Sequence, residues 1–560
     1  MPQDSKFEQT ISKKKSATAG SIFYVVIRRS SLLSNTLTWL YFATNHRGFR
    51  VLAQRLMKGF AARETLSSMF LWLRESAAAE RSTHVSYYAG WLKKTTNNQS
   101  EQEHAPINLA IITCGQNGVQ GGGPSLVEEL LQVEKEFVLV SNPEVVVERH
   151  AMVLMMQAAE KSGAAVVYCD EDIVSEIGRR SNPLFKPDFS PELLRRWDYV
   201  GPVVIVRTAA IKKSQSLSDA KTMQEIILRL ANANERIFNL PEVLVSWRKP
   251  RQKASLSPTL AADVYREKYG SSMAAALTNP AERARLLANH CVSIIIPTKD
   301  RVDLLSQCID SIRSKRTEVN YEIIIVNNNS SERSTKEYLK QIQSSEDPVK
   351  VLKASYPFNW ARLNNDAAAH STGDLLLFLN NDIEAISDDW LDRLAVQALR
   401  VDIGAVGARL TYPNGNIQHA GVVVGLGEFA DHIYTGFCEK TMGQTVFIPA
   451  DIGREVLACT GACLLVEKQK FDSLEGFNED LPICSDVEFC VRAFKAGYRT
   501  LYEADSRLVH HESATRKSTP MHPREISLAK QLFEPYLSEG DPYYNKNLSL
   551  HVRLPMFGDW

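Results

Sequence analysis

An unbroken apolar run at residues 375–379 leads directly into the polar residues Asn380, Asn381 and Asp382. A run of this length without polar alternation predicts a strand that is covered on both faces, as in a parallel sheet. Polar groups at the carboxyl end of such a strand lie where open α/β sheets bind ligands. Asp382 and the nearby Glu384 offer the hard oxygen ligands that Mg²⁺ and Mn²⁺ prefer. Taken alone, the segment is explained more simply by a strand that ends in a turn.

The segments on either side of this run alternate between apolar and amphipathic stretches. Their periodicity predicts strands at residues 292–297, 321–326 and 350–353 and helices at residues 304–314, 335–345 and 360–370. This β-α-β-α-β order with short loops is typical of a Rossmann-like nucleotide-binding half. Polar loops follow the strands at residues 298–301, 327–330 and 380–384, and we expect them to line one edge of the sheet.

Further strands and helices follow residue 384. The pattern predicts a helix at 390–399, a strand and turn at 404–413, an apolar segment at 455–466, a loop at 476–480 and a helix at 485–496. Asn414-Gly415 is a hairpin signal. Gly461 allows close backbone approach within the apolar segment, and Asp486 lies at the start of the last helix. His510 and His511 come after a further predicted strand.

The chain before residue 290 predicts a second α/β region. Strands are expected at residues 107–113, 137–140, 164–168, 199–206 and 243–248, and a helix at residues 148–162. Asp170, Glu171 and Asp172 follow the third of these strands. They are explained equally well as a metal site and as a solvated loop. Residues 251–289 are Ala-rich and predict a helical connector.

The two ends of the chain have different compositions. Residues 1–20 are polar and Lys-rich, which predicts disorder. Residues 21–100 predict helices in which Arg and Lys outnumber Asp and Glu. Such helices either dock on anionic lipid or pack on the rest of the protein with a solvated basic face. Interruptions of the apolar stripe, as at Arg28 and Arg29, favour packing. Residues 517–560 are a C-terminal extension.

Composition excludes several classes of protein. The formal net charge of the 560 residues is +0 and 44% of them are apolar, so there is no general nucleic-acid signature. The nine cysteines are scattered without a CxxC pair, which supports neither a zinc ribbon nor a disulfide framework and favours a reducing cytosol. No signal-peptide pattern and no apolar run of about 18 residues is present. We therefore expect a cytoplasmic protein, with peripheral membrane contact through the basic helices as the open alternative.

Several segments occur together in an order that resembles a known family. They are VSIIIPTKDR, IIIVNNNS, FNWARLNNDAAAHSTGDLLLFLNNDIE, IQHAGVV, TGACLLV, GFNED, SDVEFCVRAFKAGY and HHES, within residues 290–516. Their order and spacing are similar to those of family 2 glycosyltransferases, in particular rhamnosyltransferase-like members of bacterial O-antigen and surface polysaccharide clusters. The resemblance implies a GT-A fold, which is Rossmann-like. It also implies a nucleotide-diphospho-sugar donor, a glycan or lipid-linked glycan acceptor, a divalent metal (Mn²⁺ or Mg²⁺) and inversion at the anomeric carbon.

The resemblance also implies roles for individual residues. Asp382 matches the last acid of the family's DxD motif, and His510 or His511 matches a C-terminal histidine that completes the metal shell. Asp486 matches the acid that serves as the catalytic base. The nucleotide-sugar contacts implied are Pro297, Thr298, Asp300, Arg301, Asn327, Asn329, Asn365, Asn380 and Asn381. The acceptor-side residues implied are His419, Gly461, Glu479 and Asp480.

Two departures from the family pattern stand at important positions. Asn380 and Asn327 occupy places where the family usually has Asp. A neutral amide oxygen is a weaker metal ligand than a carboxylate, so the first departure predicts weaker metal binding. Both departures support the rival hypothesis of a non-catalytic glycan-binding or scaffold protein. A nucleotidyltransferase on a related fold is a second alternative.

Residues 105–250 resemble the same family more faintly. They are similar to the second half of a first GT-A unit, which predicts a truncated GT-A-like module before the catalytic domain. Ser141-Asn-Pro-Glu144 stands where a metal-binding acid pair would follow the strand, and a lone Glu144 is a poor metal clamp. We therefore expect a degenerate module with a structural or acceptor-binding role.

Overall fold

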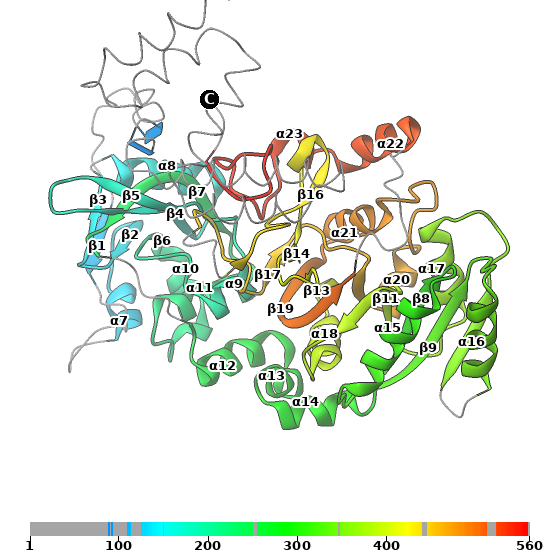
Figure 1. Cartoon of the computed structure of the whole chain (residues 1–560). Helices are drawn as coiled ribbons and strands as arrows, with labels where there is room; N and C mark the ends of the chain where they lie inside the picture. The colour runs from blue at the N-terminus through cyan, green and yellow to red at the C-terminus, as the bar shows by residue number, and fades with distance from the viewer. Residues whose placement is uncertain are drawn as a thin grey trace, which may run out of the picture. The chain divides into compact units, whose positions relative to one another are not determined.

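The computed structural model describes residues 88–89, 91–92, 109–113, 125–148, 150–249, 255–344, 348–439, 445–511 and 522–557 (Figure 1). The predicted disordered segment 1–20 lies outside these residues. So does the predicted helical region 21–100, apart from residues 88–89 and 91–92. The lipid-docking hypothesis for that region therefore stays a prediction. Within the described residues, no helix is long and apolar enough to cross a membrane.

The nucleotide-binding half predicted from the sequence is present. Its strands are β8 (Cys291–Thr298), β9 (Asn320–Asn327), β10 (Val349–Lys353) and β11 (Leu375–Leu379), and its helices are α15 (Val302–Ser314), α16 (Arg333–Gln343) and α17 (Trp360–Ala369). The strands are parallel in the order β10-β9-β8-β11. Because helices cover both faces, all five residues of β11 are buried, which is why this strand shows no polar alternation.

The same sheet continues past β11 with strands of both directions. The order is β11-β18-β13-β19-β12, with β14 beside β13 and β17 beside β19. The bounds are β12 (Ile383–Ala385), β13 (Ile403–Thr411), β14 (Ile417–His419), β17 (Arg454–Val456), β18 (Cys463–Glu467) and β19 (Arg499–His510). Around it lie α18 (Trp390–Ala398), α20 (Lys468–Ser473), α21 (Ser485–Lys495), α22 (Pro523–Phe533), α23 (Tyr536–Glu539), η2 (Leu426–Glu428) and the hairpin β15 (Val422–Val424) and β16 (Ala430–His432). The result is the mixed α/β sheet of a GT-A fold.

A first, separate sheet precedes this one. Its order is β1-β2-β6-β4-β7-β3, with β5 beside β4. The strands are β1 (Leu109–Thr113), β2 (Phe137–Ser141), β3 (Val145–Val147), β4 (Val166–Val174), β5 (Arg180–Leu184), β6 (Val203–Arg207) and β7 (Ile237–Trp247). The helices are α7 (Leu126–Leu131), α8 (Ala151–Ser162), α9 (Pro191–Arg196), α10 (Thr208–Lys213), η1 (Gln215–Leu217) and α11 (Met223–Asn232).

The first sheet repeats the plan of the second. β1-β2-β6-β4-β7-β3 corresponds to β8-β11-β18-β13-β19-β12, strand for strand and with the same parallel and antiparallel neighbours. Loop contacts repeat as well: the Asn142 N–H donates to Pro202 O at 2.9 Å, and the Asn380 N–H donates to Ala462 O at 3.0 Å. Within the described residues, the first sheet has no strands that correspond to β9 and β10. It is a GT-A-like sheet without its outer nucleotide-binding strands.

The acidic cluster Asp170, Glu171 and Asp172 is neither of the two things expected from the sequence, a metal site or a solvated loop. β4 continues to Val174, beyond the predicted end at residue 168, so Asp170, Glu171 and Asp172 lie inside the strand and are buried. Lys186 Nζ lies 2.8 Å from Glu171 Oε2, and Arg180 Nε lies 2.7 Å from Asp172 Oδ2. The cluster is therefore neither an open metal site nor a solvated loop, because Glu171 and Asp172 are ion-paired in the core and Asp170 accepts hydrogen bonds there.

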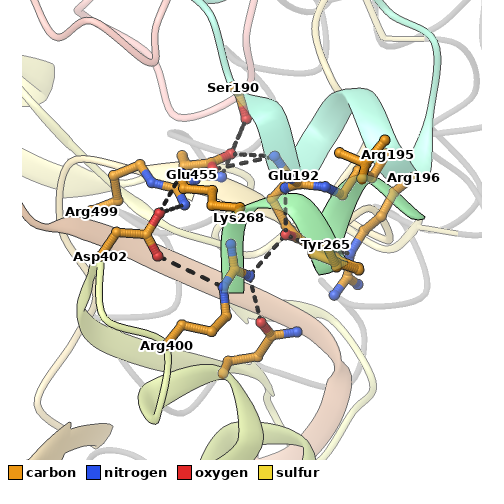
Figure 2. Close-up of polar contacts among 12 residues, drawn as sticks. Ser190, Glu192, Arg195, Arg196, Tyr265, Lys268, Arg400, Asp402, Glu455 and Arg499 are labelled. Atoms are coloured by element: carbon orange, nitrogen blue, oxygen red, sulfur yellow. Dashed lines mark hydrogen bonds and ion pairs between the residues drawn. The ribbon is translucent and has the colours of Figure 1, made fainter. Parts of the chain in front are cut away.

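The segment predicted as a helical connector is helical and lies at the junction of the two sheets. It forms α12 (Pro258–Tyr269), α13 (Ser271–Thr278) and α14 (Pro280–Leu287). Figure 2 shows the polar contacts of this junction, where Glu192 of α9 meets Tyr265 of α12 and Arg400, which follows α18. Arg400 Nη1 lies 2.9 Å from Glu192 Oε2, and the Tyr265 hydroxyl donates to Glu192 Oε1 at 2.9 Å. The two sheets are thus joined through buried, paired charges.

Candidate functional site

The carboxyl ends of β8, β9 and β11 form the polar edge that the sequence predicts. Thr298 ends β8, and its hydroxyl accepts a hydrogen bond from Asn381 Nδ2 at 3.0 Å. The Asn328 N–H donates to Thr298 O at 2.9 Å, so the loops after β8 and β9 are also joined. Parallel strands place their carboxyl ends together, which is why three loops far apart in sequence meet here.

Asp300 and Asn327 shape this edge through the backbone. Asp300 Oδ1 accepts hydrogen bonds from the N–H groups of Ser331 and Glu332, at 2.7 and 2.8 Å. Asn327 Oδ1 accepts from the Ser330 N–H at 3.0 Å, which closes a turn. These oxygens are already engaged within the loops. Both residues therefore act first as loop supports, and a nucleotide contact through them remains a prediction.

Other predicted nucleotide contacts lie along the same edge. Asp300, Arg301 and Asn329 have positive φ angles of 57°, 52° and 58°. Positive φ angles place these residues in the left-handed region, which is uncommon for residues other than Gly. The backbone therefore turns sharply where these loops leave the strand ends. Arg301 binds Asp303 at 2.7 Å. Pro297 is the second-last residue of β8, directly before Thr298, and it is half-buried.

Asp382 and His510 form a buried pair next to this edge. Ile383 of β12 lies opposite His510 of β19, which brings the residue before β12 against the end of β19. His510 Nε2 lies 3.2 Å from Asp382 Oδ1. Burial alone would raise the pKa of Asp382, but the interactions with His510 outweigh burial and hold that pKa below its usual range. Asp382 is therefore ionised at neutral pH.

Two atoms of this pair remain available as metal ligands. Asp382 Oδ1 and His510 Nδ1 are buried and make no hydrogen bond within the described residues. The 3.2 Å approach of the two side chains is thus a close contact without hydrogen-bond geometry. No group of three His, Cys, Asp or Glu side chains that could hold a metal occurs in the part of the chain that the structure describes. One carboxylate and one imidazole fit Mg²⁺ or Mn²⁺ only if substrate phosphates supply further ligands, as is usual for these ions.

His511 belongs to a different group. Its Nε2 lies 3.0 Å from Glu384 Oε2, and Gln307 Nε2 donates to the same carboxylate oxygen at 3.0 Å. The two adjacent histidines therefore point to two different acids, as alternating residues at the end of a strand must. The structure places His510, and not His511, beside Asp382.

Asp486 lies at the start of α21, beside the backbone at residues 461–462, where Ala462 O accepts from the Asn380 N–H at 3.0 Å. Its Oδ2 accepts a hydrogen bond from the Gly461 N–H at 2.6 Å, and its Oδ1 accepts from the Val487 N–H at 2.9 Å. Burial raises the pKa of Asp486 above its usual range, and the two N–H donors oppose that rise. A carboxylate with a raised pKa is a better proton acceptor than an ordinary Asp, which is what a general base requires.

His419 lies away from the protein surface. It is fully buried, and its Nδ1 is 3.2 Å from Nδ1 of His432. Burial lowers the pKa of His419 well below its usual range, so the ring is neutral. A fully buried ring cannot contact an acceptor, which corrects the acceptor-side prediction for His419.

Comparison with known proteins identifies this region. Residues 293–467 match the family described as Glycosyl transferase family 2. The chain carries a family 2 glycosyltransferase domain. Across 407 residues it is 38% identical to the O-antigen biosynthesis protein RfbC of Myxococcus xanthus, covering 69% of this chain and 32% of that one. Across 429 residues it is 33% identical to the uncharacterized protein y4gI of Sinorhizobium fredii, covering 71% of this chain and 47% of that one.

The chain thus spans about a third to a half of the length of these curated relatives. Among solved structures it is similar to GalNAc-T7 with UDP, GalNAc and Mn²⁺, at 16% identity and a TM-score of 0.34. That match covers 40% of this chain and 44% of that one.

A loop of the glycosyltransferase domain is held against α17. Asn365 Nδ2 donates to Phe477 O at 2.8 Å, and Asn365 Oδ1 accepts from the Phe477 N–H at 2.9 Å. Asn359 Nδ2 donates to Glu479 O at 2.7 Å. Since loop atoms contact both ends of its amide, Asn365 positions the loop, and a nucleotide contact through it stays a prediction. Glu479 and Asp480 are exposed on this loop.

The first sheet lacks the polar groups of the glycosyltransferase site. Glu144 takes the place of Asp382, because the Arg248 N–H donates to Glu144 O at 3.1 Å just as the His511 N–H donates to Asp382 O at 2.9 Å. Trp247, paired with Val145, takes the place of His510, paired with Ile383. The indole of Trp247 donates to Glu171 at 3.1 Å. An imidazole that could bind metal is thus replaced by a core aromatic.

The sequence reasoning passed over Trp360, which lies against Gly461 in the glycosyltransferase domain. The available signal was an aromatic residue directly after Asn359, which caps α17 by accepting from the Arg362 N–H at 3.1 Å. A large aromatic at the first, half-exposed position of a helix is not needed for the core, so it points to a surface role.

Proposed function

We propose that the chain is an inverting glycosyltransferase that moves a sugar from a nucleotide-diphospho-sugar to a glycan or lipid-linked glycan in surface polysaccharide synthesis. The observation that carries the proposal is that two carboxylates are connected through the adjacent residues Gly461 and Ala462: the Asn380 N–H beside Asp382 donates to Ala462 O at 3.0 Å, and the Gly461 N–H donates to Asp486 at 2.6 Å. Asp382 lies with His510 at the nucleotide-binding edge, and Asp486 lies on α21 with a raised pKa. The relationship to an O-antigen biosynthesis protein supports the surface polysaccharide context.

The two carboxylates would act on opposite sides of the transferred sugar. Asp486 accepts the proton of the acceptor hydroxyl as its oxygen attacks the anomeric carbon. The bond between that carbon and the phosphate oxygen breaks on the opposite face, and the nucleoside diphosphate leaves with the bonding electrons. One displacement of this kind inverts the anomeric centre. A divalent cation, when bound, would neutralise the charge that develops on the leaving diphosphate.

The residues of this chain would prepare that step. Asp382 and His510 would hold the cation, and Thr298, tied to Asn381, would fix the loops beside the nucleotide. Asn380 is half-buried next to His510, at 3.5 Å between Nδ2 and Nε2. Its amide oxygen would face the cation as a neutral ligand, which predicts weaker metal binding than a second carboxylate would give.

Nucleotide binding tests the proposal against a non-catalytic glycan-binding protein. The melting temperature of the full chain is measured with UDP, GDP or dTDP, with and without Mn²⁺. A ligand that binds only the native state raises the melting temperature, so one nucleotide should do so in a Mn²⁺-dependent way. A chain that is stabilised by none of the three would contradict the proposal.

A donor screen with released nucleotide as the readout then separates transfer from nucleotidyl transfer. A glycosyltransferase releases a nucleoside diphosphate, and a nucleotidyltransferase releases pyrophosphate. Release of diphosphate that increases when acceptor is added supports the proposal. Release of pyrophosphate from a nucleoside triphosphate and a sugar phosphate would replace it with the second hypothesis.

A further inference from the structure

The indole of Trp360 and the carboxylate of Asp486 converge on Gly461. A methyl group placed on Gly461 would lie 2.5 Å from Cη2 and 2.6 Å from Cζ2 of Trp360, and 3.2 Å from Cβ of Asp486. The same glycine donates its N–H to Asp486 at 2.6 Å. The six-membered ring of the indole therefore lies within contact of the backbone that holds the proposed base, and only a residue without a side chain fits between them.

One side of Trp360 is fixed by the protein. Its ring packs against Phe477, with ring centroids 4.8 Å apart, and near Phe378 at 6.3 Å. Asn359 fixes the start of α17 through its cap and its bond to Glu479 O. The ring is thus held rigidly from behind by the aromatic cluster and from the side by the helix cap. A rigid aromatic surface costs little conformational entropy when a ligand binds to it.

Part of Trp360 is accessible. The residue is half-buried, and its Nε1–H makes no hydrogen bond to any described residue. Indole N–H groups usually have a partner when they are covered by protein, so one without a partner on a half-buried residue is suited to a ligand. Phe358, which is 48% exposed, extends the apolar surface two residues before Trp360.

We propose that Trp360 is the platform for the acceptor sugar, on which the apolar face of a pyranose ring stacks while a hydroxyl of that sugar reaches Asp486. This rests on the proposed function and deepens it, because it states which group recognises the acceptor. The Nε1–H donates to an oxygen of the same sugar. Ligand sites of this kind combine aromatic area with a few placed polar groups.

The charges nearby indicate an uncharged sugar. Among the described residues, Asp486 borders the platform through Gly461, and Glu479 and Asp480 lie on the loop that is bonded to Asn359. The nearest basic residue of α17, Arg362, lies over the ring of Tyr356 at 4.1 Å. Carboxylates repel an acidic sugar or a phosphate but accept hydrogen bonds from sugar hydroxyls, so the class of ligand is a neutral pyranoside.

The test compares Trp360→Phe, which keeps an aromatic face, with Trp360→Leu, which does not. Methyl α- and β-pyranosides of neutral hexoses and deoxyhexoses are the probes. Their binding to the full chain is measured by saturation-transfer NMR, and the acceptor KM is measured with the donor found in the screen. We expect Trp360→Leu to raise the acceptor KM or Kd about ten- to a hundredfold, from the loss of apolar contact and ring stacking. Trp360→Phe should retain most of the affinity.

Three controls make the outcome specific. Mn²⁺-dependent stabilisation by the nucleotide and slow hydrolysis of the donor by water should be unchanged in Trp360→Leu, since neither uses the acceptor. Tyr338→Leu changes a partly buried aromatic on α16 in the same domain and should leave the acceptor KM unchanged. Gly461→Ala should raise the acceptor KM as Trp360→Leu does, because the added methyl displaces the ring.

Each other outcome overturns the inference. Equal acceptor affinity in the wild type and Trp360→Leu would show that the indole is not the platform. Loss of nucleotide stabilisation in Trp360→Leu would place the indole on the donor side. A wild type that binds nucleotide with Mn²⁺ but none of the pyranosides would also overturn it while leaving the proposed function standing.

Discussion

At the scale of single residues, we propose that Asp382 is the carboxylate on which donor chemistry depends. It is buried, ionised and within 3.2 Å of His510, with an oxygen that makes no hydrogen bond within the described residues. We expect Asp382→Asn to abolish transfer, because it removes the charged ligand of a cation whose contribution is several kcal/mol. The measurement is turnover with the screened donor. The isosteric change should shift the melting temperature by only a few degrees, and near-wild-type turnover would refute the metal assignment.

Asp486 gives a prediction that includes a pH dependence. Its pKa is raised by burial, and a base must be ionised to act. The rate should therefore fall as pH decreases through a pKa above the ordinary value of about 4 for Asp. Asp486→Asn should lower kcat by about 10²–10⁴-fold, the usual contribution of a general base. The acidic limb of the pH–rate profile should disappear from the residual activity.

Glu488→Gln is the matched control for Asp486→Asn. Glu488 lies on the same helix and binds Arg492 at 2.9 Å, away from Gly461. Glu488→Gln should lower the stability of the protein somewhat but leave the acidic limb of the pH–rate profile unchanged. Full activity of Asp486→Asn would mean that the base is another acid, with Asp480 or Glu479 as the next candidates.

The position of a candidate site residue was predictable where it follows directly from the end of one strand. The apolar run before Asp382 locates this carboxylate at a strand end, and the strand before His510 does the same for the imidazole. The pairing of His510 with Asp382 depends on the register of β12 against β19, which joins residues more than a hundred positions apart. The contact of His419 with His432 and the bonds of Asn365 to the loop at Phe477 could not be predicted, because these surroundings come from other segments.

At the scale of elements, the first sheet preserves the GT-A frame without its polar site. A sheet is held by buried apolar strands and backbone bonds, and these persist when the ligands at its edge are replaced. Glu144 and Trp247 now stand where Asp382 and His510 stand in the second sheet. The frame therefore has a packing role that does not depend on a bound nucleotide.

Glu144→Gln tests that interpretation and is matched to Asp382→Asn by position. The Glu144 side chain is 56% exposed and lies 3.7 Å from Lys249, so it is not required for packing. We expect transfer and nucleotide binding to be unchanged. A loss of kcat comparable to that of Asp382→Asn, measured on folded protein, would show that the first module takes part in the chemistry.

The acidic residues of β4 would be a poorer choice for this test. Asp170 accepts hydrogen bonds from the Lys186 N–H and from Asn545 Nδ2, at 2.8 and 2.9 Å. Alanine there would leave buried donors without acceptors and would report on folding. The sequence predicted β4 only to residue 168, because charged residues are rare inside a strand unless their partners are buried with them. Those partners, Lys186 and Asn545, are not recognisable from the local pattern.

At the scale of the whole molecule, residues 83–560 form one compact unit, and the junction in Figure 2 shows why the two sheets belong together. Glu192 N–H and the Ser190 hydroxyl of the first module bind Glu455 of the second. Arg499 bridges Glu455 and Asp402, and Lys268 of α12 lies 2.6 Å from Asp402. These contacts join three parts of the chain, so that no part alone satisfies its buried charges.

The sequence did not predict this junction. The partners that cross from one module to the other are more than 200 residues apart, such as Glu192 and Arg400 at 208 positions and Ser190 and Glu455 at 265. Periodicity finds the apolar face of an element but does not show which charge crosses from one module to the other. The strands and helices of both modules were predictable, and their mutual arrangement was not.

A substitution at Glu192 tests whether the buried charges hold the two modules together. It is buried and lies 2.9 Å from Arg400, 3.3 Å from Arg195 and 3.4 Å from Arg196. Burial would raise the pKa of Glu192, but the arginines, Arg400 foremost, hold it well below the usual range. Removing one partner of a buried charge set leaves the others uncompensated, which costs about 3–5 kcal/mol. We therefore expect Glu192→Gln to lower the unfolding free energy by that amount, measured by denaturant titration.

The pH dependence of that loss gives a second readout. A depressed pKa in the folded state means that the contribution of Glu192 is present above its unfolded pKa of about 4.3 and is lost as pH falls toward the folded value. The difference between wild type and Glu192→Gln should therefore shrink below about pH 5. Glu337→Gln is the control, since its pair with Arg333 is exposed and contributes less than about 1 kcal/mol. If Glu192→Gln were as stable as Glu337→Gln, or destabilised one module in a separate transition, the buried charges would not be what holds the two sheets in one unit.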